Sequence, residues 1–283
     1  MTQRASASEI LRQWRENAPL WAKHGATIRR MFAPVTEALI EDAGIKQGYS
    51  VLDVAGGAGE PSLTIAERVA PTGSVTCTDA INEMVSAAAS EARRRGLVNL
   101  TFRQCDAGAL PFSDNLFDAV VSRLGVMFFP DPLAALAEML RVAKPASRIS
   151  LAVWDRNDLN PFTHIVSDVV SRYVESPPAD MEAPGAFRFA ESGKLANFLR
   201  LAGAQELRER ILHFRIEAPI TAQEFFQLRS ETSDTLRDKL ARLSPEQVLL
   251  ITDEVRKAAQ SYFPNNQMSF PAQMLIVTGK KTS

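Results

Sequence analysis

Short apolar runs alternate with amphipathic stretches between residues 50 and 153. The apolar runs are rich in β-branched residues and show no strict alternation with polar ones, which is typical of strands buried on both faces. Strands that alternate with helices predict a doubly wound, mostly parallel α/β sheet. The predicted strands are Ser50–Val54, Ser74–Thr78, Leu100–Gln104, Phe117–Ser122 and Arg148–Val153, and the predicted helices are Pro61–Val69, Asn82–Arg95 and Leu133–Ala143.

The segment before the first strand, Ser6–Asp42, has a different pattern. Its aromatic and aliphatic residues recur at helical spacing, and Pro19 interrupts them, which predicts two helices broken near that residue. A third helix is predicted from Pro34 to a glycine stop at Gly44. We therefore expect residues 1–43 to form an N-terminal helical cap segment.

Residues 44–283 are predicted to form the α/β domain, with helical insertions at about 155–190 and 221–261. The first insertion contains four prolines, so that a helix is expected only over Pro161–Val174. The second is helical, with an N-cap predicted at Ser244. Three further elements, a helix over Ser192–Leu201 and strands over Glu206–Ile216 and Met268–Thr278, complete the domain.

A glycine-rich turn follows the first predicted strand in the stretch Val51–Glu60, VLDVAGGAGE. Its glycines lie at positions 56, 57 and 59, which is not the Gly-x-Gly-x-x-Gly spacing of a dinucleotide site. Asp53, just before the turn, would repel a pyrophosphate but attract a cationic amino group. This combination favours S-adenosylmethionine, which carries an ammonium and a sulfonium, over NAD.

Two more acidic residues end successive predicted strands. Asp79 follows the second strand, where a carboxylate can accept both ribose hydroxyls, and Asp106 follows the third, where it can accept from an adenine amino group. One acidic residue at a strand end is ordinarily a turn or capping residue. Three of them on the ligand-binding face of an open sheet indicate a nucleotide site.

With these motifs in place, the stretch Val51–Val153 resembles a class I S-adenosylmethionine-dependent methyltransferase, near the ubiquinone/menaquinone-biosynthesis C-methyltransferases. The matching pieces are VLDVAGGAGE, VTCTDAINEM, FRQCDAGALPFSDNLFDAVVSRLGVMFFPDP and EMLRVAKPASRISLAVW. The resemblance implies a seven-stranded Rossmann-like sheet with an antiparallel last strand, and S-adenosylmethionine as cofactor. One departure is Ala55, which stands where the family has its first glycine.

The resemblance also implies which residues bind the cofactor. They are Asp53, Ala55, Gly57, Gly59, Asp79, Ala80, Ile81, Met84, Asp106, Ala107, Ser122 and Arg123. The acidic residues are expected to meet the methionine part, the ribose and the adenine in that order. Ser122 and Arg123, after the fourth strand, are expected near the transferred methyl group.

Candidates for the substrate pocket are fewer. We expect its wall to include Trp21, Arg123, Phe128, Phe129 and Trp154, although aromatic residues at such spacings are more often part of a core. Arg123 would bind an anionic group of the substrate or pair with a nearby carboxylate. His24 and His164 are the candidate catalytic bases, with a surface or capping position as the alternative for each.

Bulk properties narrow the function further. The 283 residues include 32 Lys and Arg and 33 Asp and Glu, for a net charge of −1, so no basic excess favours nucleic acid. No metal-ligand spacing surrounds Cys77 or Cys105, and no metal site is predicted. Because no apolar stretch is long enough for a signal or a membrane span, we expect a cytoplasmic protein.

The sequence thus predicts a methyltransferase that acts on an O, N, S or C atom of an unidentified small molecule. The alternative is a protein that binds S-adenosylmethionine without methyl transfer, as a regulatory or partner module. The three helical additions are expected to form one cap over the site. Their apolar faces could instead form the interface of a homodimer.

Overall fold

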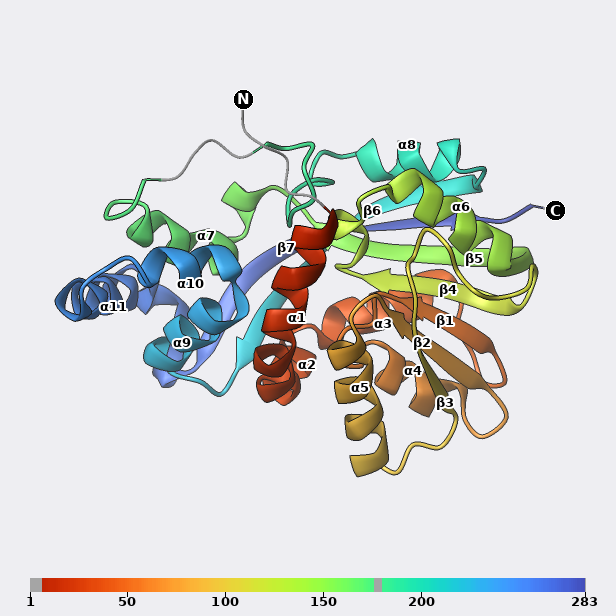
Figure 1. Ribbon diagram of the computed structural model, residues 1–283, viewed down its shortest axis with the longest axis horizontal. Helices are drawn as coiled ribbons and strands as arrows, with labels where there is room; N and C mark the ends of the chain where they lie inside the picture. Colours follow the sequence, from red (N-terminus) through yellow and green to blue (C-terminus); the bar gives the residue numbers. More distant parts are fainter. Residues whose placement is uncertain (1–6, 176–179, 283) are drawn as a thin grey trace.

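Seven strands form one sheet in the order β3-β2-β1-β4-β5-β7-β6 (Figure 1). The strands are β1 Ser50–Val54, β2 Ser74–Asp79, β3 Leu100–Gln104, β4 Phe117–Arg123, β5 Ala143–Trp154, β6 Gln205–Ala218 and β7 Met268–Lys280. Pairing is parallel from β3 through β5, whereas β7 is antiparallel to both β5 and β6. This computed structural model, which describes residues 7–175 and 180–282, confirms the predicted doubly wound sheet.

Helices cover both faces of the sheet. They are α1 Ala7–Lys23, α2 Gly25–Met31, α3 Ala33–Ala43, α4 Ser62–Val69, α5 Asn82–Arg94, α6 Pro132–Val142, α7 Pro161–Val170, α8 Lys194–Leu201, α9 Ala222–Thr232, α10 Asp234–Leu240 and α11 Pro245–Ala259. Neighbouring residues of β1 show the two layers. Val51 packs in a cluster with residues of α3 and α4, and Leu52 belongs to the main core, which includes residues of α6 and α8. Because both side chains are fully buried, the strand reads as a continuous apolar run.

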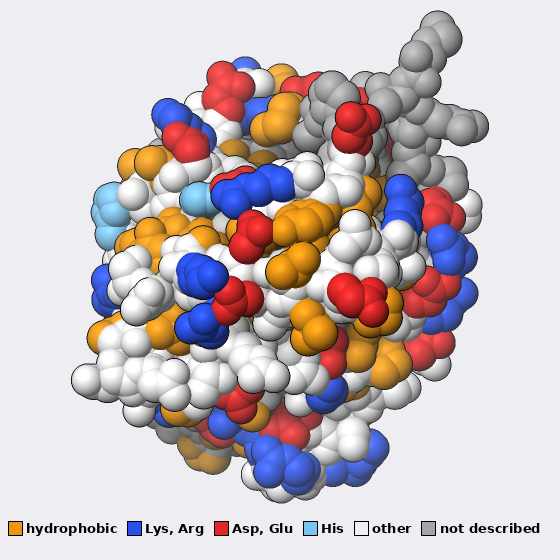
Figure 2. Space-filling model, turned by 90° about the vertical axis from the view of Figure 1, so that its left-hand side faces the viewer, with side chains coloured by type: hydrophobic (Ala, Val, Ile, Leu, Met, Phe, Trp, Pro, Cys, Tyr) orange, Lys and Arg blue, Asp and Glu red, His pale blue; other side chains and the backbone are white. Residues whose placement is uncertain are grey.

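A helical cap, made of α1, α7, α9, α10 and α11, lies beyond the carboxyl ends of the parallel strands (Figure 1). Arg237 of α10 donates to Asn17 of α1 at 2.6 Å, and Tyr173, just after α7, donates to Glu254 of α11 at 2.6 Å. On the outer face of the cap, acidic and basic side chains are interspersed with apolar ones (Figure 2). The three additions therefore meet in one unit, although α2 and α3 pack against the sheet instead.

The strands β6 and β7 extend beyond the rest of the sheet, and the cap helices pack against this extension. Trp154, the last residue of β5, is paired with Met274, whereas β6 and β7 remain paired as far as Ala218 and Met268. Phe270, in this extension, packs against rings of the cap helices. Phe162 of α7 lies 5.9 Å from it and Phe225 of α9 lies 4.9 Å from it, between ring centres.

Two predicted helix boundaries were wrong. Helix α1 continues through Pro19 to Lys23, because the half-buried rings of Trp14 and Trp21, on either side of the proline, pack together and offset the lost hydrogen bond. Helix α7 ends at Val170 rather than Val174. The stretch 221–261 contains α9, α10 and α11, and α11 begins directly after the predicted N-cap Ser244. Ser6, Pro177 and Pro178, which helped to define the predicted segments, lie outside the described residues.

Candidate functional site

The turn between β1 and α4 has an unusual backbone. Ala55, Gly57 and Gly59 have φ angles of 60°, 54° and 116°, in or near the left-handed region. At Gly56 a Cβ atom would lie 2.6 Å from Cys77 Sγ, so only glycine fits. At Gly57, in contrast, no atom of the described residues other than its two chain neighbours lies within 4 Å of the position that a Cβ would occupy, so the turn is open there. A ligand can therefore approach the backbone closely at Gly57.

The departure from the family at Ala55 is accommodated by a second glycine. A Cβ atom on Gly125, which follows β4, would lie 2.5 Å from the Cβ of Ala55. The absent side chain at Gly125 therefore leaves room for the methyl group of Ala55. The remaining cost is the left-handed backbone of an alanine, about 1–2 kcal/mol.

Asp53 is fully buried at the end of β1. Its Oδ2 accepts hydrogen bonds from the backbone N–H of Ser62 at 3.1 Å and from the Ser62 hydroxyl at 2.6 Å. Its Oδ1 has no hydrogen-bond partner among the described residues. Burial raises the pKa of Asp53 to about 7, because the charged form is poorly solvated there. Asp53 Oδ1 is therefore suited to accept a hydrogen bond from the cationic amino group of a ligand.

Asp79, at the end of β2, connects two loops. Its Oδ2 accepts from the backbone N–H of Gly57 at 3.0 Å, and its Oδ1 accepts from that of Ile81 at 2.9 Å. Burial raises the pKa of this carboxyl group, although the two N–H groups partly offset the effect. Asp79 thus holds the glycine-rich turn against the start of α5, and each oxygen retains a lone pair for a further donor.

The residues predicted for the adenine lie around the start of α5. Ile81 and Met84 are buried in one cluster with Ala18, and Trp14, Trp21 and Ala58 pack against it. Helix α1 therefore covers this side of the glycine-rich turn rather than the far edge of the sheet. Ala80 and Ala107 are half-buried nearby in sequence, and Asp106 is exposed, with its Oδ1 accepting from Gly108 N–H at 2.9 Å.

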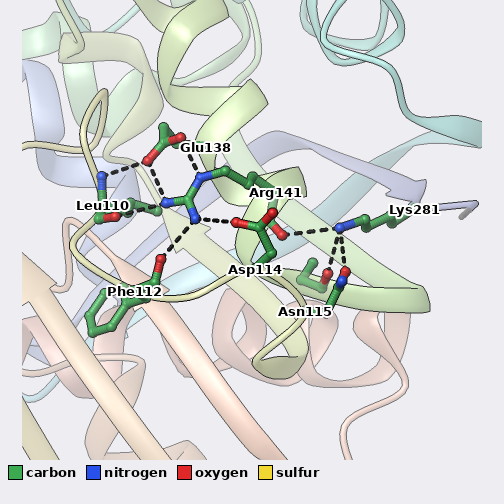
Figure 3. A network of polar contacts seen from close by, with 8 residues as sticks. Leu110, Phe112, Asp114, Asn115, Glu138, Arg141 and Lys281 are labelled. Carbon is green, nitrogen blue, oxygen red and sulfur yellow. Dashed lines mark hydrogen bonds and ion pairs between the residues drawn. The ribbon is translucent and has the colours of Figure 1, made fainter.

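A polar network fixes the loop from β3 to β4, which includes Asp106 (Figure 3). The guanidinium group of Arg141, on α6, donates to the carbonyl oxygens of Leu110 and Phe112, both at 2.8 Å. It also forms ion pairs with Glu138 at 2.6 Å and Asp114 at 2.7 Å. Arg141, on helix α6, therefore anchors the loop between β3 and β4.

The two residues predicted after β4 differ in their surroundings. The hydroxyl of Ser122 is buried without a hydrogen-bond partner among the described residues. Arg123 donates to Thr36 Oγ1 at 3.0 Å, and its guanidinium carbon lies 5.8 Å from the centre of the Phe32 ring. Burial lowers the pKa of Arg123, and the charges of Glu60 and Asp53 act in the opposite direction. No carboxylate of the described residues forms an ion pair with it.

The aromatic residues predicted for the pocket fall into two groups. Trp21 packs with Trp14, which in turn contacts the Phe128 ring edge-on at 5.0 Å. Trp154, in contrast, stacks on Phe162 with ring centres 6.5 Å apart and forms the second group together with Phe32. Phe129 is almost fully buried, and its carbonyl oxygen accepts from Arg188 at 2.6 Å.

The two candidate catalytic histidines are both paired with carboxylates. His24 lies between α1 and α2, half-buried, with Nε2 2.6 Å from Glu231 Oε2 on α9. His164 lies on α7, with Nδ1 2.7 Å from Asp168, whose side chain is 63% exposed. Neither pair includes a residue of the glycine-rich turn. Among the described residues, no group of His, Cys, Asp and Glu could hold a metal ion, and no helix could span a membrane.

Several residues that shape the site were missed from the sequence. Ser62 and Gly125 are revealed only by the fold, since each acts on a residue distant along the chain. Arg229, on α9, was also missed. The available signal was an arginine three and four positions after Phe226 and Phe225, on the buried face of a helix.

With this geometry established, the family can be assigned. A methyltransferase-domain family model matches residues 45–203, more than half of the chain. The chain therefore belongs to the class I S-adenosylmethionine-dependent methyltransferases, as its resemblance implied, and S-adenosylmethionine is the cofactor of this class.

Curated relatives agree with this assignment. An uncharacterized protein of Mycobacterium tuberculosis is 38% identical over 137 residues, 48% of each chain. The nocamycin O-methyltransferase of Saccharothrix syringae is 31% identical over 205 residues, 69% of this chain and 73% of the relative. A ubiquinone/menaquinone-biosynthesis C-methyltransferase of Pasteurella multocida is 30% identical over 178 residues, 61% and 63% of the two chains. The chain thus spans only about half the length of the mycobacterial relative.

The fold also matches a solved structure. The YcgJ protein of Bacillus subtilis superposes with a TM-score of 0.54 at 21% identity, over 88% of this chain and 98% of that chain. At this level of identity the likeness concerns the fold alone. It supports the Rossmann-like fold of the chain.

Proposed function

We propose that this protein transfers the methyl group of S-adenosylmethionine to a small-molecule acceptor held between the sheet and the cap. The observation that carries the proposal is the buried Asp53 Oδ1, to which no described residue donates a hydrogen bond, beside a turn that is open at Gly57. The amino group of the cofactor would satisfy this oxygen, and its ribose hydroxyls could donate to the free lone pairs of Asp79. The residues present therefore fit the cofactor.

The residues of the chain then act mainly by positioning. When bound, S-adenosylmethionine supplies an activated methyl group and its own leaving group. Asp53 and Asp79 orient the cofactor, Ser122 and Arg123 line the end of β4, and the cap keeps water from the site. We propose that the acceptor is contacted by Trp21 and Phe128 on one side and by Trp154 on the other.

A proton acceptor is needed only where the acceptor atom carries a proton to lose. Of the two candidates, we propose His24 for this role, because it is half-buried inside the cap and a carboxylate holds it. His164 pairs with an exposed residue on the surface. The pH profile of the His24→Gln variant tests the assignment. If one limb of the bell-shaped dependence of activity on pH disappears in the variant, the role of His24 as proton acceptor is supported. An unchanged dependence rejects that role.

Calorimetry is the first test of the whole proposal. The protein should bind S-adenosylmethionine and S-adenosylhomocysteine and should not bind NAD. A panel of small hydroxyl, amine, thiol and enol compounds, read by mass spectrometry for methylated products, then tests transfer. Tight binding of the cofactor with no product across the panel would favour the non-methylating alternative. Failure to bind either sulfur nucleotide would reject both.

A further inference from the structure

Arg95, at the carboxyl end of α5, is paired with two carboxylates of the neighbouring segment. Its Nη1 donates to Glu60 Oε1 at 2.9 Å, and its Nη2 donates to Glu67 Oε1 at 2.5 Å. Glu60 is the residue after the last glycine of the glycine-rich turn, and Glu67 lies in the last turn of α4. One guanidinium group therefore holds α4 against α5 near both ends of α4.

The pair with Glu60 is shielded from water, whereas the pair with Glu67 is not. The side chains of Arg95 and Glu60 are 11% and 10% exposed, and that of Glu67 is 53% exposed. Glu60 Oε2 also accepts from Thr64 Oγ1 at 2.7 Å, so both oxygens of this carboxylate are bonded. Surface ion pairs contribute little to stability, but removing one member of a shielded pair leaves a poorly solvated charge. The pair of Arg95 and Glu60 therefore fixes the position of Glu60.

Glu60 lies two residues before Ser62, which orients Asp53. The Ser62 hydroxyl and backbone N–H both donate to Asp53 Oδ2, and no described residue donates to Oδ1. On the other side of Glu60, the N–H of Gly59 donates to the carbonyl oxygen of Gly56 at 2.9 Å. Because both ends of this short segment are bonded within the cofactor site, a displacement of Glu60 would disturb the turn and the carboxylate together.

The charges around Asp53 give the pair a second effect. Burial is the main cause of the raised pKa of Asp53, hydrogen bonds and the charge of Arg123 lower it, and the charge of Glu60 raises it further. Cys77 is the register partner of Asp53 on β2, but burial raises the pKa of its thiol, which therefore stays neutral. The positive charge of Arg95 offsets that of Glu60 and thereby favours the ionised form of Asp53.

We propose that Arg95 is a positioning residue for the cofactor, which holds residues 56–62 through Glu60 so that Asp53 Oδ1 stays free for the amino group of S-adenosylmethionine. Arg95 acts through Glu60 and is not itself expected to contact the ligand. A binding group needs such support from behind, because its orientation sets how well it meets the ligand. This inference rests on the proposed function, in which Asp53 binds the amino group.

Calorimetry with S-adenosylhomocysteine at about pH 8 tests the positioning role in the full chain. Arg95→Met should weaken binding by about tenfold, as for a misplaced hydrogen bond to a charged group. Arg95→Lys should recover part of this loss, because an ammonium group can still pair with Glu60. Glu67→Gln removes only the exposed partner and should bind as tightly as the parent. Arg94→Met, whose ion pair with Glu91 lies within α5, is the matched control.

A pH series separates the positioning role from one that only stabilises the fold. The pH below which affinity falls should shift upward in Arg95→Met, because the negative charge of Glu60 is then no longer offset. It should shift downward in Glu60→Gln, which removes that charge. In the double variant, the loss of affinity should not exceed that of Arg95→Met alone, because both changes break the same pair. Thermal unfolding without ligand shows that each variant is folded.

Two results would overturn the proposal. They are an affinity and pH dependence in Arg95→Met equal to those of Arg94→Met, and a loss in Glu67→Gln as large as that in Arg95→Met. If Arg95→Met does not fold, Arg95→Lys and Glu60→Gln decide, since unchanged affinity and pH dependence in both would equally reject the role of the pair. A parent protein that binds no S-adenosylhomocysteine, or binds it equally at every pH, would instead reject the proposed contact of Asp53. That outcome is seen before any variant is compared.

Discussion

The methyl group of Ala55 fills the space that a side chain on Gly125 would need, since the two Cβ atoms would lie 2.5 Å apart. Two loops, after β1 and after β4, are therefore coupled by one steric contact at the candidate site. A family glycine has been replaced at one position, and a glycine at the other makes the replacement possible.

This contact predicts non-additive stabilities. Gly125→Ala should lower the free energy of unfolding by about 1–3 kcal/mol, the usual cost of overpacking. Ala55→Gly should restore part of that loss in the double variant, because it removes the closest clash. Urea denaturation of the four proteins measures the coupling. Gly25→Ala is the control, since no described atom beyond its chain neighbours and the backbone of its own helix lies within 4 Å of its Cβ position. Additive effects would show that the two residues are independent.

Asp53 predicts that cofactor affinity depends on pH. Its pKa of about 7 should fall when the ammonium group of the cofactor binds, so that binding releases a proton below pH 7. Affinity should therefore fall by up to about tenfold for each pH unit below 7. Calorimetry at several pH values measures this, and Asp53→Asn should remove the dependence. A flat profile for the parent would contradict the assigned contact.

The same pKa has the opposite effect on the ligand-free protein. Because it is raised from 3.8 to about 7, the native state retains a proton that the unfolded chain releases in this range. The contribution of Asp53 to stability is present below pH 3.8 and is lost as the pH rises through 7. Comparison of the parent with Asp53→Asn across these pH values isolates the effect.

Asp79→Ala should weaken S-adenosylmethionine binding by about 1.5–3 kcal/mol, the range for hydrogen bonds to a charged group. It should also free the backbone N–H groups of Gly57 and Ile81, which hydrogen exchange would detect as faster exchange. Asp106→Ala, at an exposed carboxylate that accepts from a single local N–H, should have a smaller effect. A variant that is strongly destabilised yet binds normally would assign Asp79 a purely structural role.

Glu231 holds the first helix of the cap to α9. A hydrogen bond from Lys23, with further bonds from Gln227 and His24, lowers the pKa of Glu231 to about 2. Its stabilising contribution should be present above pH 4.5 and should be lost as the pH falls toward 2. Glu231→Gln should increase hydrogen exchange in α1. Asp253→Asn, whose ion pairs lie within α11, should leave α1 unchanged.

Arg141→Met should release the loop that contains Asp106. The variant removes the donors to Leu110 and Phe112 and both ion pairs, so we expect faster hydrogen exchange over residues 105–116 and weaker cofactor binding. The loss of stability should be about 1–2 kcal/mol, since the side chain is 32% exposed. Arg94→Met removes a pair within α5 and is the matched control. Unchanged exchange in the loop would contradict the anchoring role.

The sheet could be predicted from the sequence because its signal is local. Buried strands, amphipathic helices and a glycine stop at Gly44 each depend on a few neighbouring residues. Ser244 was likewise predicted as an N-cap and does form a capping box with Gln247. Helix α1 was harder, because packing of Trp14 and Trp21 overrides the breaking effect of Pro19.

Contacts between distant segments could not be predicted in this way. The partner of Ala55 is 70 residues away at Gly125, and the ring against Arg229 of α9 is that of Phe162 on α7. Arg123 was expected to bind an anionic group of the substrate or to pair with a carboxylate. Nothing in the sequence indicated the Thr36 hydroxyl and the Phe32 ring that lie beside it in the fold. Such pairs are specified by topology rather than by any local pattern.

The position of β7 in the sheet affects how the chain folds during translation. β7 lies between β5 and β6, yet it follows both in the sequence. Until it leaves the ribosome, the long strand β6 has no neighbour, and its backbone donors and acceptors are exposed to other chains. The cap helices α9 to α11 are made in the same interval without the sheet extension that supports them. A nascent chain therefore depends on protection from aggregation until a strand late in its sequence is inserted.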